Sequence, residues 1–193
     1  QEQREPVNAK QPGRITAQGI QYGGHLKIGL ATEPTSLDAI LGRSGGDAYF
    51  WHQIFDQLVD ANPDLTPRPE TSLALRWEIT HEPEAITFYL RPNVVFHDGS
   101  PFDAAAVKFN IERILDPKTL ATPRASMTLI DSVDVVDELT VRFNLRSPWG
   151  AGLNMLADRG GVMNSPARVL ELAKDYSWAP AGTGPFKVNK VIT

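Results

Sequence analysis

Residues 86–107 read ITFYLRPNVVFHDGSPFDAAAV, and this stretch combines the signals for two strands, two turns and the start of a helix. Apolar side chains at 86, 88 and 90 alternate with residues of the other face, which is the period of a strand with one buried side. A proline–asparagine pair at 92–93 ends that strand, because proline fixes its φ angle and asparagine tolerates turns. The β-prone run at 94–96 predicts a second short strand that stops at His97-Asp98-Gly99.

A helix is predicted directly after this run. Asp103 is a typical N-cap residue, and Asp116-Pro117 marks the end of the helix. Between them, apolar residues recur at helical spacing, at Val107, Ile111, Ile114 and Leu115. The strands and the helix are therefore expected to share one core.

The ordered residues of 86–99 resemble family 5 of the extracellular solute-binding proteins, the oligopeptide, dipeptide and nickel receptors of bacterial ABC importers. That family carries a block of the form Tyr-Thr-Phe-x-Leu-Arg-x-x-Val-x-Phe-His-Asp-Gly. Further blocks follow in the family's order, at residues 24–30, 33–38, 54–59, 73–79, 136–143, 164–167 and 182–186. The resemblance runs from about residue 23 to residue 191.

The chain departs from the family pattern in three places. Two residues appear inserted before Trp77, Arg76 replaces a serine, and the turn at 81–85 lacks the usual Asp-Gly. Family members also continue far beyond the GTGPF block at 182–186 into a second lobe, whereas this chain ends at Thr193. The resemblance therefore implies the front part of a longer receptor.

The implied fold is α/β and periplasmic-binding-protein-like (type II), with a first lobe of mixed β-sheet and flanking helices and without the second lobe. Residues 1–21 lack periodicity and predict a flexible leader. Residues 22–50 and 180–193 are expected to belong to the central sheet of the first lobe, and 51–179 to its subdomain. The remaining elements predicted from periodicity are a strand at Leu26, Ile28 and Leu30, a helix that carries Trp51, Ile54, Phe55, Leu58 and Val59, a hairpin of 133–135 with 139–145, a helix over 167–174, and a strand containing Phe186 and Val188.

Composition is that of an ordinary globular domain, with 41% hydrophobic and 22% charged residues. The net charge of −4 argues mildly against nucleic acid or an anionic membrane as partner, and a local basic patch stays open as an alternative. Zero cysteines exclude disulfides and thiolate metal sites. No apolar run approaches the roughly 18 residues of a membrane span, and no signal peptide begins at Gln1. The family implies a periplasmic or extracellular protein whose signal has been removed.

Catalysis is not expected. His97 and Asp98 suggest metal or general-base chemistry, but no second histidine or glutamate stands at ligand spacing, and a histidine beside Asp-Gly is expected to bond to backbone in its turn. Gly182-Thr183-Gly184 is followed by a proline rather than by a P-loop lysine, so a turn is expected there. No Gly-x-Ser-x-Gly elbow is present. Neither a metal nor a cofactor is predicted.

Ligand binding is a better interpretation than catalysis, because the resemblance implies that a ligand is held between two lobes. The first lobe's contribution corresponds to the loop at 40–49, where Arg43, Ser44, Gly45 and Tyr49 are the candidates. Glycine allows close backbone approach, Arg43 can pair with a carboxylate, and Tyr49 can stack on a peptide plane. Arg159, in the run Asp158-Arg159-Gly160-Gly161, is the second candidate. The alternatives are a solvated Arg43, a Tyr49 packed on its helix, and an Arg159 that counters a helix dipole.

The implied function is the substrate-binding component of an ABC-type importer, a monomer that captures a short peptide or another small solute and delivers it to permease subunits. The resemblance places the anchor for the ligand's amino group in the second lobe, so this chain alone is expected to bind peptide weakly. Nickel complex, sugar, opine and glutathione stay open as ligands. The alternative function is a solute-binding-like sensor or interaction domain of a regulatory protein.

Overall fold

The computed structural model describes residues 24–82 and 84–192. The chain divides into two compact units, Gln1–Ala31 and Thr32–Thr193, and each is considered by itself. In the first unit, the described residues 24–30 belong to no helix or strand, so the strand predicted at Leu26, Ile28 and Leu30 is wrong for this structure. A strand is stable only when a neighbour completes its hydrogen bonds, and the described residues supply none here. The predicted leader, 1–21, lies outside the described residues.

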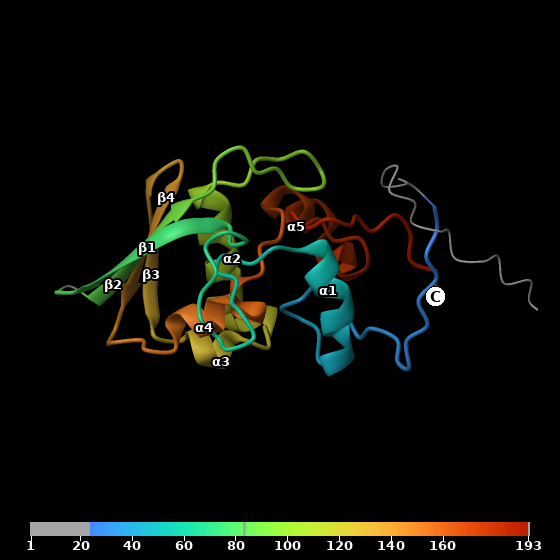
Figure 1. The fold of residues 1–193 in the computed structure, drawn as a ribbon, viewed down its shortest axis with the longest axis horizontal. Helices are drawn as coiled ribbons and strands as arrows, with labels where there is room; N and C mark the ends of the chain where they lie inside the picture. Colours follow the sequence, from blue (N-terminus) through green and yellow to red (C-terminus); the bar gives the residue numbers. More distant parts are fainter. Residues whose placement is uncertain (1–23, 83, 193) are drawn as a thin grey trace, which may run out of the picture. The chain divides into compact units, whose positions relative to one another are not determined.

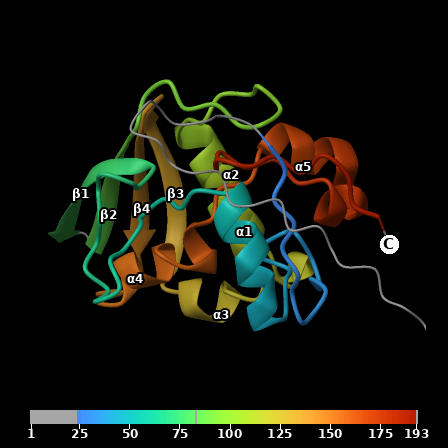
Figure 2. The ribbon, with the colours of Figure 1, turned by 45° about the vertical axis from the view of Figure 1, so that its right-hand side comes forward.

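The second unit contains all the regular elements of the described residues. They follow in the order η1 (Gly45–Asp47), α1 (Ala48–Ile54), β1 (Ala74–His81), β2 (Glu84–Leu90), α2 (Ala104–Leu115), η2 (Pro117–Thr119), α3 (Arg124–Met127), β3 (Ile130–Asp137), β4 (Thr140–Leu145), α4 (Gly152–Leu156), η3 (Arg159–Gly161), α5 (Pro166–Leu172) and η4 (Ala173–Trp178). Each η is a short 3₁₀ helix. In Figure 1 and Figure 2 the sheet lies at one end of this unit, and α2 lies between the sheet and α5.

The four strands form one sheet in the order β1-β2-β4-β3, and every neighbouring pair is antiparallel. The predicted hairpin is confirmed as β3 and β4, with Val133 opposite Phe143 and Val135 opposite Val141. The α/β architecture is also confirmed, but these strands do not form the expected mixed sheet. Short connections join β1 to β2 and β3 to β4, and a tight reversal of the chain allows only antiparallel pairing.

The stretch 86–107 folds largely as its pattern predicts. Its first part lies in β2, and Asp103 caps α2 by accepting a hydrogen bond from the amide of Ala106 at 2.8 Å. The second predicted strand is reduced to a single bridge between Val95 and Pro101. The chain reverses at once after Phe96, whose amide donates to the carbonyl of Ser100 at 2.8 Å, so no room is left for a ladder.

The main hydrophobic cluster lies between the sheet and α2. Val107, Ile111 and Ile114 of α2 are fully buried, and the rings of Phe88 and Phe143 lie 4.9 Å apart. A second, smaller cluster surrounds α1 and contains Ala39, Trp51, Ile54, Phe55 and Val162. Helix α1 ends earlier than predicted, at Ile54. Leu58 and Val59 are buried in a bend after the helix instead, where the amide of Leu58 donates to the carbonyl of Gly161 at 2.7 Å.

The last segment of the second unit, from residue 182 onward, runs along the C-terminal end of α1. A Cβ at Gly182 would lie 2.2 Å from the carbonyl oxygen of Ile54, so only glycine fits this close approach. The amides of Gly184 and Phe186 donate to the carbonyls of Ile54 and Gln53. The predicted strand at Phe186 and Val188 is not formed, since residues 185–192 have no ladder in the described part of the chain. The helix predicted for 167–174 is α5, which ends at Leu172.

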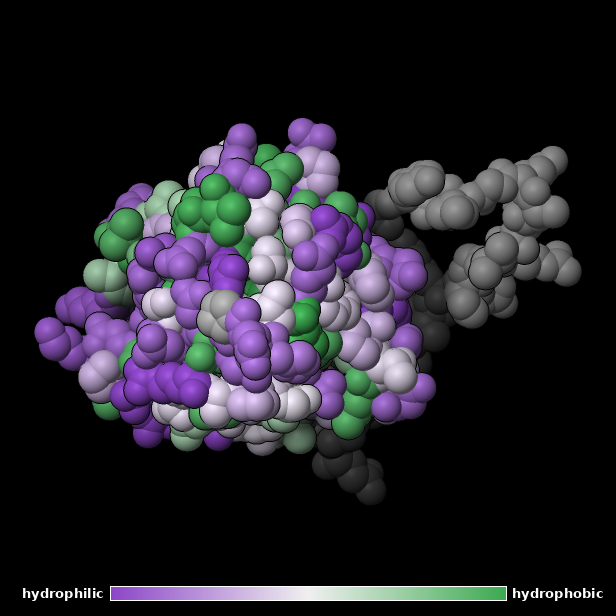
Figure 3. All heavy atoms as spheres, turned by 90° about the vertical axis from the view of Figure 1, so that its left-hand side faces the viewer, coloured by the Kyte–Doolittle hydropathy of each residue, from purple (hydrophilic) through white to green (hydrophobic). Residues whose placement is uncertain are grey.

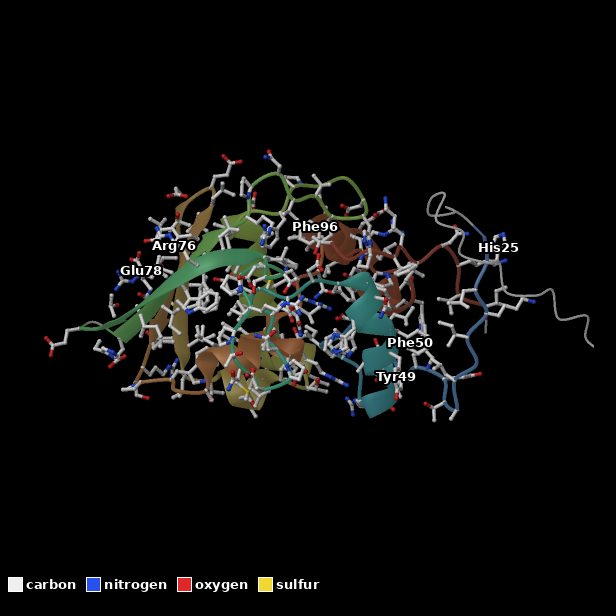
Figure 4. All side chains as sticks on the ribbon, in the orientation of Figure 1. His25, Tyr49, Phe50, Arg76, Glu78 and Phe96 are labelled. Carbon is white, nitrogen blue, oxygen red and sulfur yellow. The ribbon has the colours of Figure 1, made fainter. Side chains whose placement is uncertain are left out.

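The solvent face of the sheet is polar. Arg76 of β1 pairs with Glu78, and its guanidinium carbon stacks 3.3 Å from the centre of the Tyr89 ring on β2. The labelled side chains of Arg76 and Glu78 lie together in Figure 4. Figure 3 views this end of the molecule, where hydrophilic residues predominate and hydrophobic ones form separate small groups. Arg76, one of the departures from the family pattern, therefore lies on an exposed strand face.

Candidate functional site

The loop before α1 is held in shape by Asp47. Its two carboxylate oxygens accept hydrogen bonds from the Thr35 amide at 2.7 Å, the Thr35 hydroxyl at 2.6 Å and the Ser44 amide at 2.9 Å. Ser44 completes a capping box, because its hydroxyl accepts from the Gly46 amide at 3.1 Å. Burial alone would raise the pKa of Asp47, but these hydrogen bonds and the charge of Arg159 outweigh it and lower the pKa.

Arg159 fixes the same loop from the other side. Its guanidinium donates one hydrogen bond to the carbonyl of Gly42 and another to the carbonyl of Ser44, the latter at 2.8 Å. The loop is therefore clamped between a buried carboxylate and a half-buried guanidinium. With two of its donors occupied by backbone, Arg159 acts mainly as a positioning residue, a role that its sequence context did not reveal.

A pocket of about 340 Å³ opens beside this loop. The structure brings four of the five predicted residues into its lining, namely Arg43, Ser44, Gly45 and Arg159. Tyr49 is not among the residues that line it. Tyr49 lies on α1 with 68% of its surface exposed, and Figure 4 shows its side chain on the outer side of that helix.

Sequence reasoning missed most of the remaining lining of the pocket. It contains Thr122, Pro123, Ser126, Met127, Met155 and Asp158. Asp158 stands directly before Arg159 in the sequence, and this acidic–basic pair was the available signal. The remaining wall residues come from the region of α3 and from α4, and no motif marks them.

The charged side chains of the pocket differ in whether other residues already bind them. Arg43 is exposed, and its side chain makes no hydrogen bond or ion pair with any described residue. Asp158 is exposed as well, while Arg159 is bound to the loop. A Cβ added at Gly45 would meet nothing within 4 Å, so the backbone there faces open space. The pocket thus offers a free cation, a carboxylate and an accessible stretch of backbone.

His97 has a structural role. Its Nε2 lies 2.7 Å from the carbonyl oxygen of Gly184, and its Nδ1 accepts from the Gly182 amide at 3.3 Å. These partners define the Nε2–H tautomer. The sequence predicted backbone partners in the histidine's own turn, whereas the observed partners lie in a turn that is distant in the chain. Within residues 24–82 and 84–192, no three His, Cys, Asp or Glu side chains gather in a way that would hold a metal ion.

Comparison with known protein families identifies the family of this chain. The description "Bacterial extracellular solute-binding proteins, family 5 Middle" matches residues 68–192. The chain belongs to this family. The resemblance seen in the sequence is therefore confirmed, and family 5 consists of solute-binding proteins, in agreement with the expectation that the chain is not an enzyme.

Individual relatives of family 5 agree with this assignment. The glutathione-binding protein GsiB from Pectobacterium atrosepticum is 39% identical over 115 residues, which cover 60% of this chain and 22% of GsiB. The periplasmic binding protein AgaA from A.tumefacien R10, solved with agropinic acid, superposes with a TM-score of 0.73 at 33% identity. NikZ from Campylobacter jejuni, solved with Ni(L-His), superposes with a TM-score of 0.72 at 26% identity.

These matches confirm the periplasmic-binding-protein-like fold. AgaA and NikZ cover 80% and 84% of this chain, which in turn covers 31% and 32% of theirs. The chain therefore spans between a fifth and a third of the length of these relatives. Within the described ranges, no helix has the length and apolar character needed to cross a bilayer.

Proposed function

We propose that the chain is part of the substrate-binding component of an ABC-type importer, a protein that captures a small solute, with a short peptide as the expected ligand, for transfer to a membrane permease. The observation that carries this proposal is the pocket beside the 42–45 loop, with its unoccupied Arg43, in a family 5 chain. The relatives' names support solute capture and differ in the solute: glutathione for GsiB, agropinic acid for AgaA and Ni(L-His) for NikZ.

Each site residue has a proposed role. Arg43 pairs with a ligand carboxylate, and Ser44 and Gly45 present backbone groups to the ligand. Arg159 holds these groups in place through the carbonyls of Gly42 and Ser44. Tyr49, exposed at the end of the loop, stacks on a ligand only when a further part of the protein closes over it.

The proposed organisation follows the family. Residues 22–50 and 180–193, which form no strand in the described chain, contribute to the central sheet of the first lobe when strands from beyond this chain pair with them; 51–179 form its subdomain, and the second lobe lies outside this chain. The protein acts as a monomer in the periplasm or outside the cell after removal of its signal peptide, and it binds no nucleic acid. Two lobes that close on a ligand bury its polar groups against fixed donors, which gives both affinity and selectivity.

The site can be tested by NMR titration of the 193-residue chain with a tripeptide up to about 10 mM, a range that detects the weak affinities expected of half a site. We expect amide shifts confined to residues 42–45 and the neighbouring wall of the pocket. Arg43→Ala should remove them while leaving the loop folded, because the Arg43 side chain has no partner among the described residues.

Two comparisons make this test decisive. Arg159→Ala should broaden the signals of the loop even without ligand, since both clamped carbonyls are released. Glu112→Ala, on the exposed face of α2, should leave the titration unchanged. Shifts that persist undiminished in Arg43→Ala would place the ligand elsewhere and overturn the assignment of the site.

A further inference from the structure

A second pocket, which shares no residue with the Arg43 pocket, lies between α5, η4 and the segment after Gly184. Its volume of about 390 Å³ falls within the range of small-molecule sites, roughly 300–1,000 Å³. In Figure 2, α5 and the red C-terminal segment lie near one another. We call it the Trp178 pocket, and its charged and aromatic lining consists of His97, Asp98, Arg168, Trp178, Lys187 and Lys190.

Three of these side chains are cationic, although the chain as a whole has a net charge of −4. Arg168 gives one Nη to Glu171 at 2.8 Å and its Nε to the carbonyl of Ala179 at 3.4 Å, and its second Nη has no partner among the described residues. Lys187 donates to the carbonyl of His97 at 3.0 Å, and Lys190 makes no bond to any described residue. Arg168 is already paired with Glu171, whereas Lys187 and Lys190 form no ion pair with any described residue, so a bound anion reduces the repulsion between the cations.

The single carboxylate of the pocket does not neutralise them. Asp98 Oδ2 accepts from the Ser165 hydroxyl at 2.5 Å, and Oδ1 accepts from the Ser100 hydroxyl at 2.6 Å and the Ser100 amide at 3.0 Å. Its acceptor sites are thus largely taken up by neutral serine donors, and none of the three cations bonds to it. Three cations stand against two carboxylates, Asp98 and the Glu171 that pairs with Arg168, so the balance of charge at the pocket is one positive charge.

Trp178 adds an aromatic surface. Tryptophan is the largest side chain and is highly buried on average, yet 41% of Trp178 is exposed, at the border of this pocket. Its ring can stack on a planar ligand group beside the cations. His97 on another wall is held by Gly182 and Gly184, so that wall is preformed.

We propose that the Trp178 pocket is a second binding site, which takes a small anion whose carboxylates are attached to a planar ring. Arg168 and Lys190 contact the carboxylates, Lys187 adds to the positive field, and the ring stacks on Trp178. The site is independent of the proposed importer function and of Arg43.

The test is an NMR titration of the 193-residue chain with phthalate, observed at the indole N–H of Trp178. We expect a saturable shift that weakens as salt is raised from about 20 to about 200 mM, because surface charges are screened over that range. Lys190→Gln should raise the dissociation constant for phthalate about two- to fivefold, the effect expected for the loss of one exposed charge. Lys108→Gln, an exposed lysine on α2, is the matched control and should have no effect.

Three comparisons decide between outcomes. Trp178→Leu lacks the indole N–H, so its binding is followed by calorimetry, which should show no saturable binding of phthalate; an otherwise unchanged amide spectrum would show that this variant still folds. Succinate, which has the charges without the ring, and benzyl alcohol, which has the ring without the charges, should both bind more weakly than phthalate. Equal binding of succinate and phthalate, equal effects of Lys190→Gln and Lys108→Gln, or no shift with phthalate would each overturn the proposal. Since Arg43 is not involved, Arg43→Ala should leave phthalate binding intact whether or not the importer proposal holds.

Discussion

Replacing Asp47 by asparagine should cost stability in a way that depends on pH. The carboxylate accepts three hydrogen bonds from Thr35 and Ser44, and an amide in its place turns an N–H group toward donors. We expect Asp47→Asn to lower the free energy of unfolding by about 1–3 kcal/mol at pH 7, the usual penalty for leaving buried polar groups unpaired.

The pH dependence has a definite sign. Because the folded state lowers the pKa of Asp47 below 3.8, its contribution is fully present above that pH and is lost as the pH falls through the folded-state value. The stability difference between wild type and Asp47→Asn should therefore shrink below pH 3.8, as measured by urea unfolding. Glu112→Gln, in an exposed pair with Lys108, supplies the control. A difference that stays constant down to about pH 2 would contradict this account.

At the same scale, the sequence grouped residues that the fold brings together but did not describe their contacts. Arg43, Ser44, Gly45 and Arg159 were all predicted to bind a ligand, and all four line one pocket, while the binding itself stays a prediction. The role of Arg159 was not predictable, because its carbonyl acceptors at Gly42 and Ser44 lie more than a hundred residues away in the chain. Asp158 was missed although it stands directly before Arg159, because its place in the pocket lining exists only in the folded chain.

Between elements, a buried pair of asparagines joins α2 to the chain before α5. Asn110 donates to the carbonyls of Ala106 at 2.9 Å and Asn164 at 2.8 Å, and it accepts from the Asn164 amide at 3.0 Å. Tyr176 extends the network by donating its hydroxyl to Asn164 at 2.8 Å. Burial raises the pKa of Tyr176 well above its ordinary value, so the hydroxyl stays a donor.

Asn110→Ala should destabilise the protein by about 2–4 kcal/mol, because it leaves the buried amide and carbonyl of Asn164 without their partner. Urea unfolding at neutral pH measures this. Glu112→Ala on the exposed face of the same helix should change stability by no more than about 0.5 kcal/mol. A cost below about 1 kcal/mol for Asn110→Ala would mean that the network is replaced by water or by local rearrangement.

Helices and strands with a strong local sequence signal could be predicted, whereas strands that need a partner distant in the chain could not. The N-cap at Asp103, the periodicity of α2 and the alternation in β4 are local properties, and each appears where it was expected. Residues 26–30 and 186–188 alternate just as clearly but form no strand in the described chain. Alternation supplies one face of a strand, whereas the ladder requires a neighbour that a local pattern cannot name.

At the level of the whole molecule, the candidate site covers a ligand from one side only. The 340 Å³ pocket is built by the 42–45 loop, α3, α4 and η3, all within the unit 32–193, and Arg43, Asp158 and Gly45 are exposed to solvent. A ligand bound there keeps much of its surface in water while it loses translational and rotational freedom. The contacts of a single open pocket offset that loss only in part.

We therefore expect the 193-residue chain to bind a tripeptide with a dissociation constant of about 1 mM or weaker, near −4 kcal/mol, when measured by calorimetry. We expect a protein of the relatives' length, of which this chain spans 22% to 32%, to enclose the ligand from a second side and to bind it at least a hundredfold more tightly, by about 2.7 kcal/mol. The same calorimetry on a protein extended to that length measures the difference, with Arg43→Ala in both lengths as the control. Micromolar binding by the 193 residues alone would refute the division of the site between two lobes, because the pocket beside Arg43 would then suffice.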